Sequence, residues 1–406
     1  MTGKRTAVAC AVGTALMVAV TGCASSSLGG SSSASGGNTI NVMMFNSGKA
    51  ATLDWSPATL AVTTYVNDYL NPAGGINGKQ VKLIVCEDQL DPNKAAACAQ
   101  QAVKDGVVAV VGGMSINGNR FLPGIEPSGI PYAVTLPLST SDYTSPVSFP
   151  MQGGTVLNYS GAAGELAREG CQKIGLLVNP IATSAALEGF ARKGATAAGA
   201  ELVSTVSVAA GTADMSSAYA KMRADGAQCA VIGTVEQDLV NFANYSAQSG
   251  APIPLAASTG GVPPQALTAL SPGAVAQLHL TGGSYGAADR SVPEVAQYAN
   301  QMAKSNPGAP VEDKGTAAWG TATAVFQAMK NVQGDITAKS VADALGRLCP
   351  LPTEIYGPNV CFTKPATTDP SFKRTFNANL FVYSVKSDRS IVLAGPPATR
   401  PELLPG

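Results

Sequence analysis

Histidine is almost missing from this sequence, since His279 is the only one among 406 residues. The eight cysteines form no CxxC pair, so the residues that build most zinc sites lack their usual spacing and we expect no metal. Neither a GxGxxG nor a P-loop motif occurs, and we therefore expect no bound cofactor. These absences point away from metalloenzymes and nucleotide-dependent enzymes.

An excess of one charge is also lacking. The 26 Lys and Arg residues balance 26 Asp and Glu residues, so nothing predicts nucleic-acid binding. Beyond residue 22 no apolar run has the length and purity of a membrane span. An α/β hydrolase is the strongest enzyme alternative, but the sequence around Ser115 lacks the final glycine of a GxSxG elbow. His279 lies between two leucines in a strand-like stretch, where a buried structural role is expected. We therefore expect no catalysis.

The first 22 residues have the pattern of a signal peptide. A positive start is followed by a short apolar run over residues 6–20 and then by Val-Thr-Gly before Cys23. This resembles a bacterial lipobox, which predicts acylation of Cys23 and a lipid anchor in the membrane. An ordinary cleaved signal, with Cys23 uninvolved, is the alternative. Residues 23–38 are mostly Ser and Gly, and we expect them to form a flexible tether.

Six cysteines are left after Cys10 in the signal and Cys23 are set aside. An even number in an exported chain predicts disulfides, although six cysteines allow fifteen connectivities. Two pairs are each twelve positions apart and are suited to closing a local loop, and the third pair precedes two strand-like runs whose starts could meet. The preferred pairing is Cys86–Cys98, Cys171–Cys229 and Cys349–Cys361.

Strand-like and helix-like segments alternate along the chain. Asp91 followed by Pro92 predicts a helix from there to Lys104, with Asp at the N-cap and Pro in the first turn. The alternation starts again near residue 173, so the chain is α/β with two doubly wound parallel-sheet lobes. Residues 136–155, rich in Pro, Ser, Thr and Gly, are expected to cross between the lobes as a strand or hinge. The predicted strands are 39–45, 81–86, 107–111, 173–178, 201–208, 230–232, 378–385 and 391–393, and the predicted helices are 57–69, 91–104, 184–198, 214–224, 239–248, 292–304 and 313–331.

Ligands of open parallel sheets bind beyond the carboxyl ends of the strands. Two such lobes facing each other would bind a ligand in the cleft between them. The loops that this rule selects are 46–55, 112–119, 136–140, 179–184, 233–237 and 258–262.

Three stretches resemble the leucine/isoleucine/valine-binding type of periplasmic binding protein, with the type I periplasmic-binding fold. They are NPAGGINGKQVKLIVCEDQLDPNKAAACAQQAV at 71–103, VVAVVGGMS at 107–115 and GIPYAV at 129–134. The resemblance implies two lobes joined by three crossings that close on a small molecule. We also expect a monomer, anchored outside the cytoplasm through Cys23. The resemblance also implies delivery to an ABC permease with cytoplasmic ATPases. The expected lobes are residues 39–152 plus 284–374 and residues 153–283 plus 375–400, with a tail at 401–406.

The resemblance carries over to several residues of the first lobe. Trp55 matches an aromatic that packs on the ligand. Ser115 and Ser139 match hydroxyl residues that bind a carboxylate, with Thr140 as an alternative to Ser139. Asn117, in the same loop as Ser115, is a further candidate ligand contact. Ser and Asn also satisfy backbone groups in turns, so a structural role is the alternative for these positions.

The second lobe departs from the family pattern. Ser184 stands where an aromatic is expected, and Val235 and Glu236 stand where a tyrosine is expected. Gly260, beside Thr259, occupies the place of the acid that pairs with a ligand's α-ammonium. A buried ammonium without a carboxylate is costly, so either Glu236 replaces the acid or the ligand has no α-ammonium. We favour the second. A binding module that signals to a receptor partner is the alternative function.

Overall fold

Residues 38–50, 53–180 and 184–406 are described by the structure, a computed structural model. The predicted signal peptide, Cys23 and the tether up to residue 37 lie outside these ranges, so the lipid anchor stays a prediction. Within the described ranges, none of the helices combines the length and the apolar character needed to cross a membrane.

The first sheet has five parallel strands in the order β4-β1-β5-β6-β7. Strand β1 alternates between two cores: Val42 and Met44 belong to one cluster, and Met43 and Phe45 to the other. Both faces are therefore covered, as expected for a continuous apolar strand in a parallel sheet. The strands are β1 (Thr39–Asn46), β4 (Gln80–Glu87), β5 (Ala109–Gly112), β6 (Tyr132–Val134) and β7 (Ser148–Pro150).

The second sheet has the order β14-β13-β12-β11-β10-β8-β9, with β15 pairing to β13. Strands β8 to β12 run parallel, whereas β13 is antiparallel to β12 and to β14. The late strands predicted near the end of the chain thus complete this sheet. The strands are β8 (Lys173–Val178), β9 (Glu201–Ser207), β10 (Cys229–Gly233), β11 (Leu255–Ser258), β12 (Leu278–Gly282), β13 (Asn379–Val385), β14 (Ile391–Leu393) and β15 (Ala398–Thr399).

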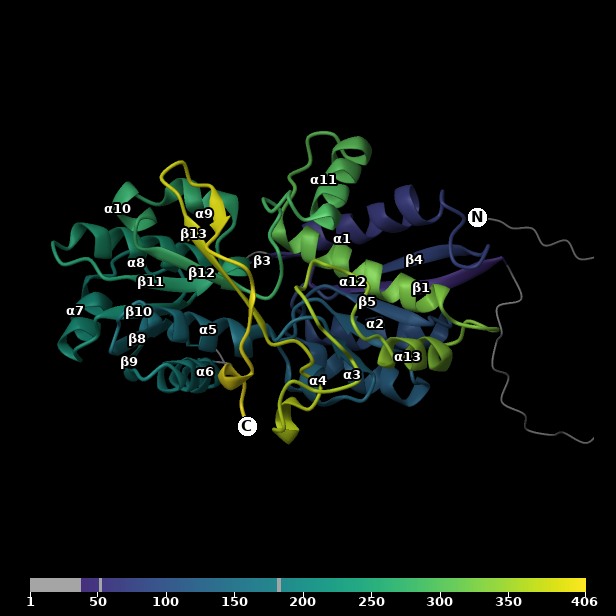
Figure 1. The fold of residues 1–406 in the computed structure, drawn as a ribbon, viewed down its shortest axis with the longest axis horizontal. Helices are drawn as coiled ribbons and strands as arrows, with labels where there is room; N and C mark the ends of the chain where they lie inside the picture. The colour runs from purple at the N-terminus through teal and green to yellow at the C-terminus, as the bar shows by residue number, and fades with distance from the viewer. Residues whose placement is uncertain (1–37, 51–52, 181–183) are drawn as a thin grey trace, which may run out of the picture. The chain divides into compact units, whose positions relative to one another are not determined.

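The helices flank the sheets, and Figure 1 shows α1 and α12 side by side, in contact with β1 and β5 respectively. As predicted, α2 begins at Pro92 with Asp91 as its N-cap, and the Asp91 carboxylate accepts from the Asn93 amide at 2.7 Å. The helices are α1 (Ser56–Thr64), continued by a π-helical segment (Tyr65–Leu70), α2 (Pro92–Lys104), α3 (Gly118–Ile125), α4 (Thr140–Thr144), α5 (Gly154–Arg168), α6 (Ser184–Ala197), α7 (Ser216–Ala224), α8 (Glu236–Gln248), α9 (Pro264–Ala269), α10 (Pro272–Val275), α11 (Pro293–Ser305), α12 (Asp313–Lys330) and α13 (Ala338–Gly346).

The prediction that residues 136–155 form a crossing was wrong for most of that stretch. It contains α4 and then β7, which pairs with β6 in the first sheet. Only residues 151–153 connect β7 to α5 and the second sheet. After β12 the chain passes from the second sheet back to the helices that cover the first sheet, and before β13 it passes to the second sheet again. Hydrogen bonds tie these connections together, because Asn377 donates to the Met151 carbonyl at 2.8 Å.

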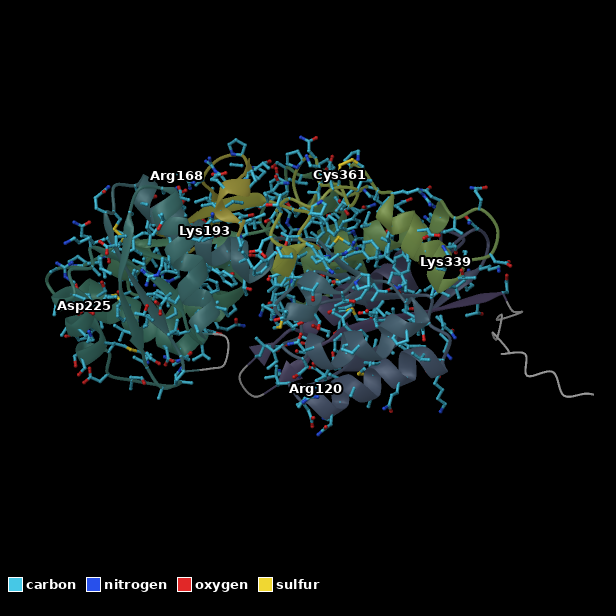
Figure 2. All side chains as sticks on the ribbon, turned by 90° about the horizontal axis from the view of Figure 1, so that it is seen from below. Arg120, Arg168, Lys193, Asp225, Lys339 and Cys361 are labelled. Atoms are coloured by element: carbon cyan, nitrogen blue, oxygen red, sulfur yellow. A yellow bond between two sulfur atoms is a disulfide. The ribbon has the colours of Figure 1, made fainter. Side chains whose placement is uncertain are left out.

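All three predicted disulfides are present: Cys86–Cys98, Cys171–Cys229 and Cys349–Cys361, the last visible at Cys361 in Figure 2. Cys229 opens β10, and Cys171 lies just before β8. Because β8 and β10 are paired neighbours in parallel register, the two strand starts do meet, as expected.

Candidate functional site

The six loops predicted to bind ligand all follow the carboxyl ends of parallel strands. Three come after β1, β5 and β6 of the first sheet, and three come after β8, β10 and β11 of the second. This is the edge at which parallel sheets bind small molecules. Residues 51–52 and 181–183 of these loops lie outside the described ranges, and Ser184 is described only as the first residue of α6.

Ser115 and Asn117 surround a fully buried carboxylate, Asp88. The Ser115 hydroxyl donates to Asp88 Oδ2, and Asn117 Nδ2 donates to the same oxygen at 3.1 Å. Asp88 Oδ1 accepts from the Leu90 amide at 3.0 Å. Ser115 Oγ also accepts from the Asn117 amide at 2.9 Å. Because a hydroxyl has a single proton to donate, that of Ser115 is committed to Asp88.

Ser139 is the N-cap of α4 and shares a capping box with Asp142. The Asp142 carboxylate accepts from the Ser139 amide at 2.7 Å and from the Leu138 amide at 2.9 Å. Burial nevertheless raises the pKa of Asp142 to about 6, because these bonds offset the desolvation only in part. A Cβ on Gly118 would collide with Ser139 Oγ, so the start of α3 lies directly against this cap. Thr140, the first residue of α4, is exposed.

Trp55 lies at the start of α1 and is only 4% exposed, so its ring is part of the core. Its backbone is held by the Gly48 carbonyl at 2.7 Å and by Asn46 Nδ2 at 2.7 Å. Lys314, in the first turn of α12, places Nζ 5.9 Å from the centroid of the Trp55 ring. The same ammonium donates to the Asp54 carbonyl at 2.7 Å. Trp55 and Lys314 are therefore neighbours.

Glu236 is the first residue of α8, and its side chain is exposed. Partial burial raises the pKa of Glu236, and the positive charge of Lys314 opposes this shift. The start of α8 is held by Asn179, whose Oδ1 accepts from the Val235 amide at 2.7 Å. Asn179 Nδ2 in turn donates to the buried Asp238 at 2.7 Å. This network fixes the start of α8, the helix whose first residue is Glu236.

Thr259 and Gly260 lie in a 3₁₀ turn (Thr259–Gly261) that contacts α12, the helix that carries Lys314. A Cβ on Gly260 would find only Ser258 Oγ, at 4.0 Å, so this position borders open space. Two groups emerge among the predicted residues. Ser115, Asn117 and Ser139 lie beside buried acids. Trp55 and Glu236 lie near Lys314, and the Thr259–Gly261 turn contacts the helix that carries Lys314.

Lys314 and Asp88 were not predicted as site residues. Asp88 belongs to the stretch at 71–103 that carries the family resemblance, so its place after a strand was a usable signal. No local pattern distinguishes Lys314, because its contact with Asp54 spans a separation of 260 residues.

Two surface hollows lie away from these loops. One, of about 570 Å³, lies between the start of α11 and residues 351–354, and the other, of about 360 Å³, lies near Cys171. No predicted ligand-binding residue lines either of them. In the first, Glu294 accepts from Thr353 Oγ1 at 2.7 Å and from the Glu354 amide at 2.9 Å. These bonds fasten the Cys349–Cys361 loop to α11, which gives Glu294 a structural role.

The chain's histidine does not pair with Ser115. His279 is the second residue of β12, so it lies toward the amino end of that strand, and its Nδ1 is 3.2 Å from Glu169 Oε1. Ser115 follows β5 in the other sheet and donates to Asp88. The serine–histidine contact of a hydrolase is thus not made by this pair.

Comparisons with known proteins agree with this architecture. A family model described as periplasmic binding protein matches residues 39–389. The leucine-, isoleucine-, valine-, threonine-, and alanine-binding protein of Pseudomonas aeruginosa is 44% identical over 45 residues, which is 11% of this chain. That match spans only 12% of the relative.

Two solved structures are similar over most of their length. A fatty acid ABC transporter substrate-binding protein from Thermomonospora curvata has a TM-score of 0.76 at 15% identity, covering 90% of this chain and 94% of that one. A branched-chain amino acid ABC transporter from Thermus thermophilus with bound valine has a TM-score of 0.73 at 17% identity, covering 90% and 97%. At these identities the likeness concerns the fold, and it confirms the predicted type I periplasmic-binding architecture.

Proposed function

Because this chain belongs to the periplasmic binding protein family, we propose that it is the extracytoplasmic substrate-binding subunit of an ABC importer of the branched-chain-amino-acid type. It captures a small polar or carboxylate-bearing solute between the loops of its two sheets and delivers it to a permease driven by cytoplasmic ATPases. The observation that supports this most directly is that Trp55 and Glu236, which follow strands of different sheets, both lie near Lys314, on the helix that the Thr259–Gly261 turn contacts.

Capture proceeds by closure of the two lobes about the connections between the sheets. The expected lobes, residues 39–152 plus 284–374 and residues 153–283 plus 375–400, divide the chain close to these connections. A ligand favours the closed state only by its differential affinity for it. The bond from Asn377 to Met151, at 2.8 Å, and that from the Tyr285 amide to the Ile355 carbonyl, also 2.8 Å, hold the connections together during this motion.

The ligand class follows from what the second lobe offers. Gly260 presents no acid for an α-ammonium, and Glu236 is the nearest replacement on α8. The similar structures whose names mention valine and fatty acid are compatible with an amino acid and with an amine-free acid respectively. We favour the amine-free acid because it needs no buried carboxylate partner.

Membrane attachment through an acylated Cys23 completes the proposal, with residues 24–38 as the tether and a monomer as the working unit. A lipid anchor would keep the binding protein near its permease and so raise the effective concentration of the pair. Intact-mass measurement of the membrane fraction tests this, with Cys23→Ser as the variant expected to lose the acyl mass and the attachment.

Thermal unfolding of residues 24–406 against a panel of neutral amino acids, matching acids without the amine, amides and aromatic acids tests solute capture. A true ligand at one hundred times its Kd should add about 2.7 kcal/mol of stability and raise the midpoint. Small-angle X-ray scattering should show a smaller radius of gyration with the same compound. A panel without any stabilising compound, under conditions in which the protein is folded, would contradict the proposal.

A further inference from the structure

Lys314 has an unusual environment for a lysine. It is half-buried and lies over the ring of Trp55. One of its three N–H groups donates to the Asp54 carbonyl at 2.7 Å. Among the described residues, the ion pairs with N···O of 4.0 Å or less do not include Lys314. Two N–H donors of the half-buried Lys314 ammonium therefore have no partner among the described residues.

The acids around Lys314 are occupied or more distant. The Asp54 carboxylate accepts from the Ser56 amide at 2.9 Å and pairs with Lys49 at 3.6 Å. Asp313 is turned to the connection after β12, where it accepts from the Ala287 amide at 2.7 Å. The charge of Lys314 acts on all four acids, Asp54, Glu236, Glu312 and Asp313, but none of them forms an ion pair with it among the described residues.

The serines that the family resemblance marks for a carboxylate are poorly suited to that role here. The Ser115 proton is committed to the buried Asp88, and Ser139 caps α4 beside the buried Asp142. A ligand carboxylate bound directly at Ser115 or Ser139 would approach a buried acid, Asp88 or Asp142, and like charges repel strongly at short range in a low dielectric. The anion-binding part of the site therefore belongs elsewhere.

We propose that Lys314 pairs with the carboxylate of the ligand, and that the substrate class is a small organic acid without an α-amine. This inference rests on the proposed solute-binding function and specifies its ligand. Two N–H donors of Lys314 are available for a charge-assisted hydrogen bond. An α-ammonium, one carbon from the carboxylate, would lie close to the Lys314 ammonium and be repelled by it. Gly260 offers no acid to compensate.

Isothermal titration calorimetry on the folded soluble chain, residues 24–406, tests this assignment. The probes are 4-methylpentanoate and benzoate, their uncharged amides, and leucine, which is 4-methylpentanoate with an α-ammonium. The variants are Lys314→Met, which keeps length and apolar contact without charge, and Lys314→Arg, which keeps the charge. Lys330→Met is the matched control, because Lys330 ends the same helix about 24 Å away.

We expect the wild type to bind at least one acid more tightly than its amide and more tightly than leucine. Lys314→Met should weaken that acid by about tenfold or more through loss of a charge-assisted bond, with little change for the amide. Lys314→Arg and Lys330→Met should stay close to the wild type.

Equal binding of the acid by Lys314→Met and by the wild type would overturn the assignment. So would tighter binding of leucine or of an amide than of the matching acids, although capture of a small solute would then stand. Failure of all five probes to bind the folded wild type would overturn this inference, and it would contradict the proposed function itself if the wider panel also gave no ligand.

Discussion

Acidification is expected to stabilise this protein through Asp142. The carboxyl group is buried at the start of α4, where Oδ2 accepts two amides and Oδ1 has no partner. Burial raises its pKa from 3.8 to about 6. Because the folded-state pKa lies above the unfolded one, the stabilisation is complete below about pH 4 and is lost as the pH rises through about 6.

The size of this effect follows from the shift. One pKa unit corresponds to about 1.4 kcal/mol, so a rise from 3.8 to about 6 amounts to about 3 kcal/mol in full, of which about 2.5 kcal/mol is lost between pH 4 and pH 7.5. Asp142 is 2% exposed, so solvent screening reduces this figure little. Burial also raises the pKa of other acids, including Glu294 and Asp313, and these add to the total pH dependence. A comparison with Asp142→Asn isolates the contribution of one residue.

Urea unfolding at pH 4, 6 and 7.5, followed by the fluorescence of the buried Trp55 and Trp319, measures this difference. The free energy of unfolding of Asp142→Asn, taken relative to that of the wild type, should rise by about 2.5 kcal/mol from pH 4 to pH 7.5, since the amide does not titrate. Asp68→Asn, at an exposed position in the π-helical segment, is the control and should parallel the wild type. A stability difference between Asp142→Asn and the wild type that stays constant over this range would refute the reasoning.

Three further predictions concern stability. Asp88→Ala should cost about 3–5 kcal/mol in urea unfolding, because it strands the buried donors of Ser115 and Asn117; a loss below about 1 kcal/mol would mean that these donors find other partners. Gly194→Ala should lower the free energy of unfolding by about 2 kcal/mol or more, because the new Cβ would strike the Ser160 carbonyl where α5 and α6 pack. Gly189→Ala on the same helix meets nothing within 4 Å and should raise the free energy of unfolding by about 0.5–1 kcal/mol. Equal effects of the two substitutions would refute the steric explanation. Replacing Cys171 and Cys229 together by serine should lower the midpoint of thermal unfolding by an amount equivalent to about 2–5 kcal/mol, and an unchanged midpoint would show that this disulfide does not restrict the unfolded chain.

Much of the fold was predictable because it depends on interactions between residues close together in the sequence. Apolar β-branched runs have one favourable environment, a strand covered on both faces, and β8 was predicted with the bounds that it has. The Asp91–Pro92 pair specifies a helix start through one side-chain bond and one fixed φ, and α2 begins there. The disulfide between Cys171 and Cys229 followed from parallel neighbours whose starts share one edge.

Other elements were decided only by tertiary pairing. Strand β7 has three residues, Ser148–Pro150, too few for any periodicity, and it is a strand because β6 provides its hydrogen-bond partner. The sequence alone marked Ser115 and Ser139 as carboxylate ligands from a family pattern. In the folded chain the Ser115 hydroxyl donates to the buried Asp88, and the Ser139 hydroxyl accepts from the Asp142 amide, contacts that depend on tertiary pairing and on the start of α4. Their role as carboxylate ligands stays a prediction.

The sequence by itself thus determined the alternation of strands and helices, the cysteine pairing and the sheet edge at which the predicted ligand-binding loops lie. Tertiary structure decided which charge reaches that edge. Lys314 lies beside Trp55 because α12 packs against α1, and the two side chains are joined by no local pattern. Backbone preference and apolar periodicity act over a few residues, whereas the field at a binding site is the sum of charges that folding brings together from distant parts of the chain.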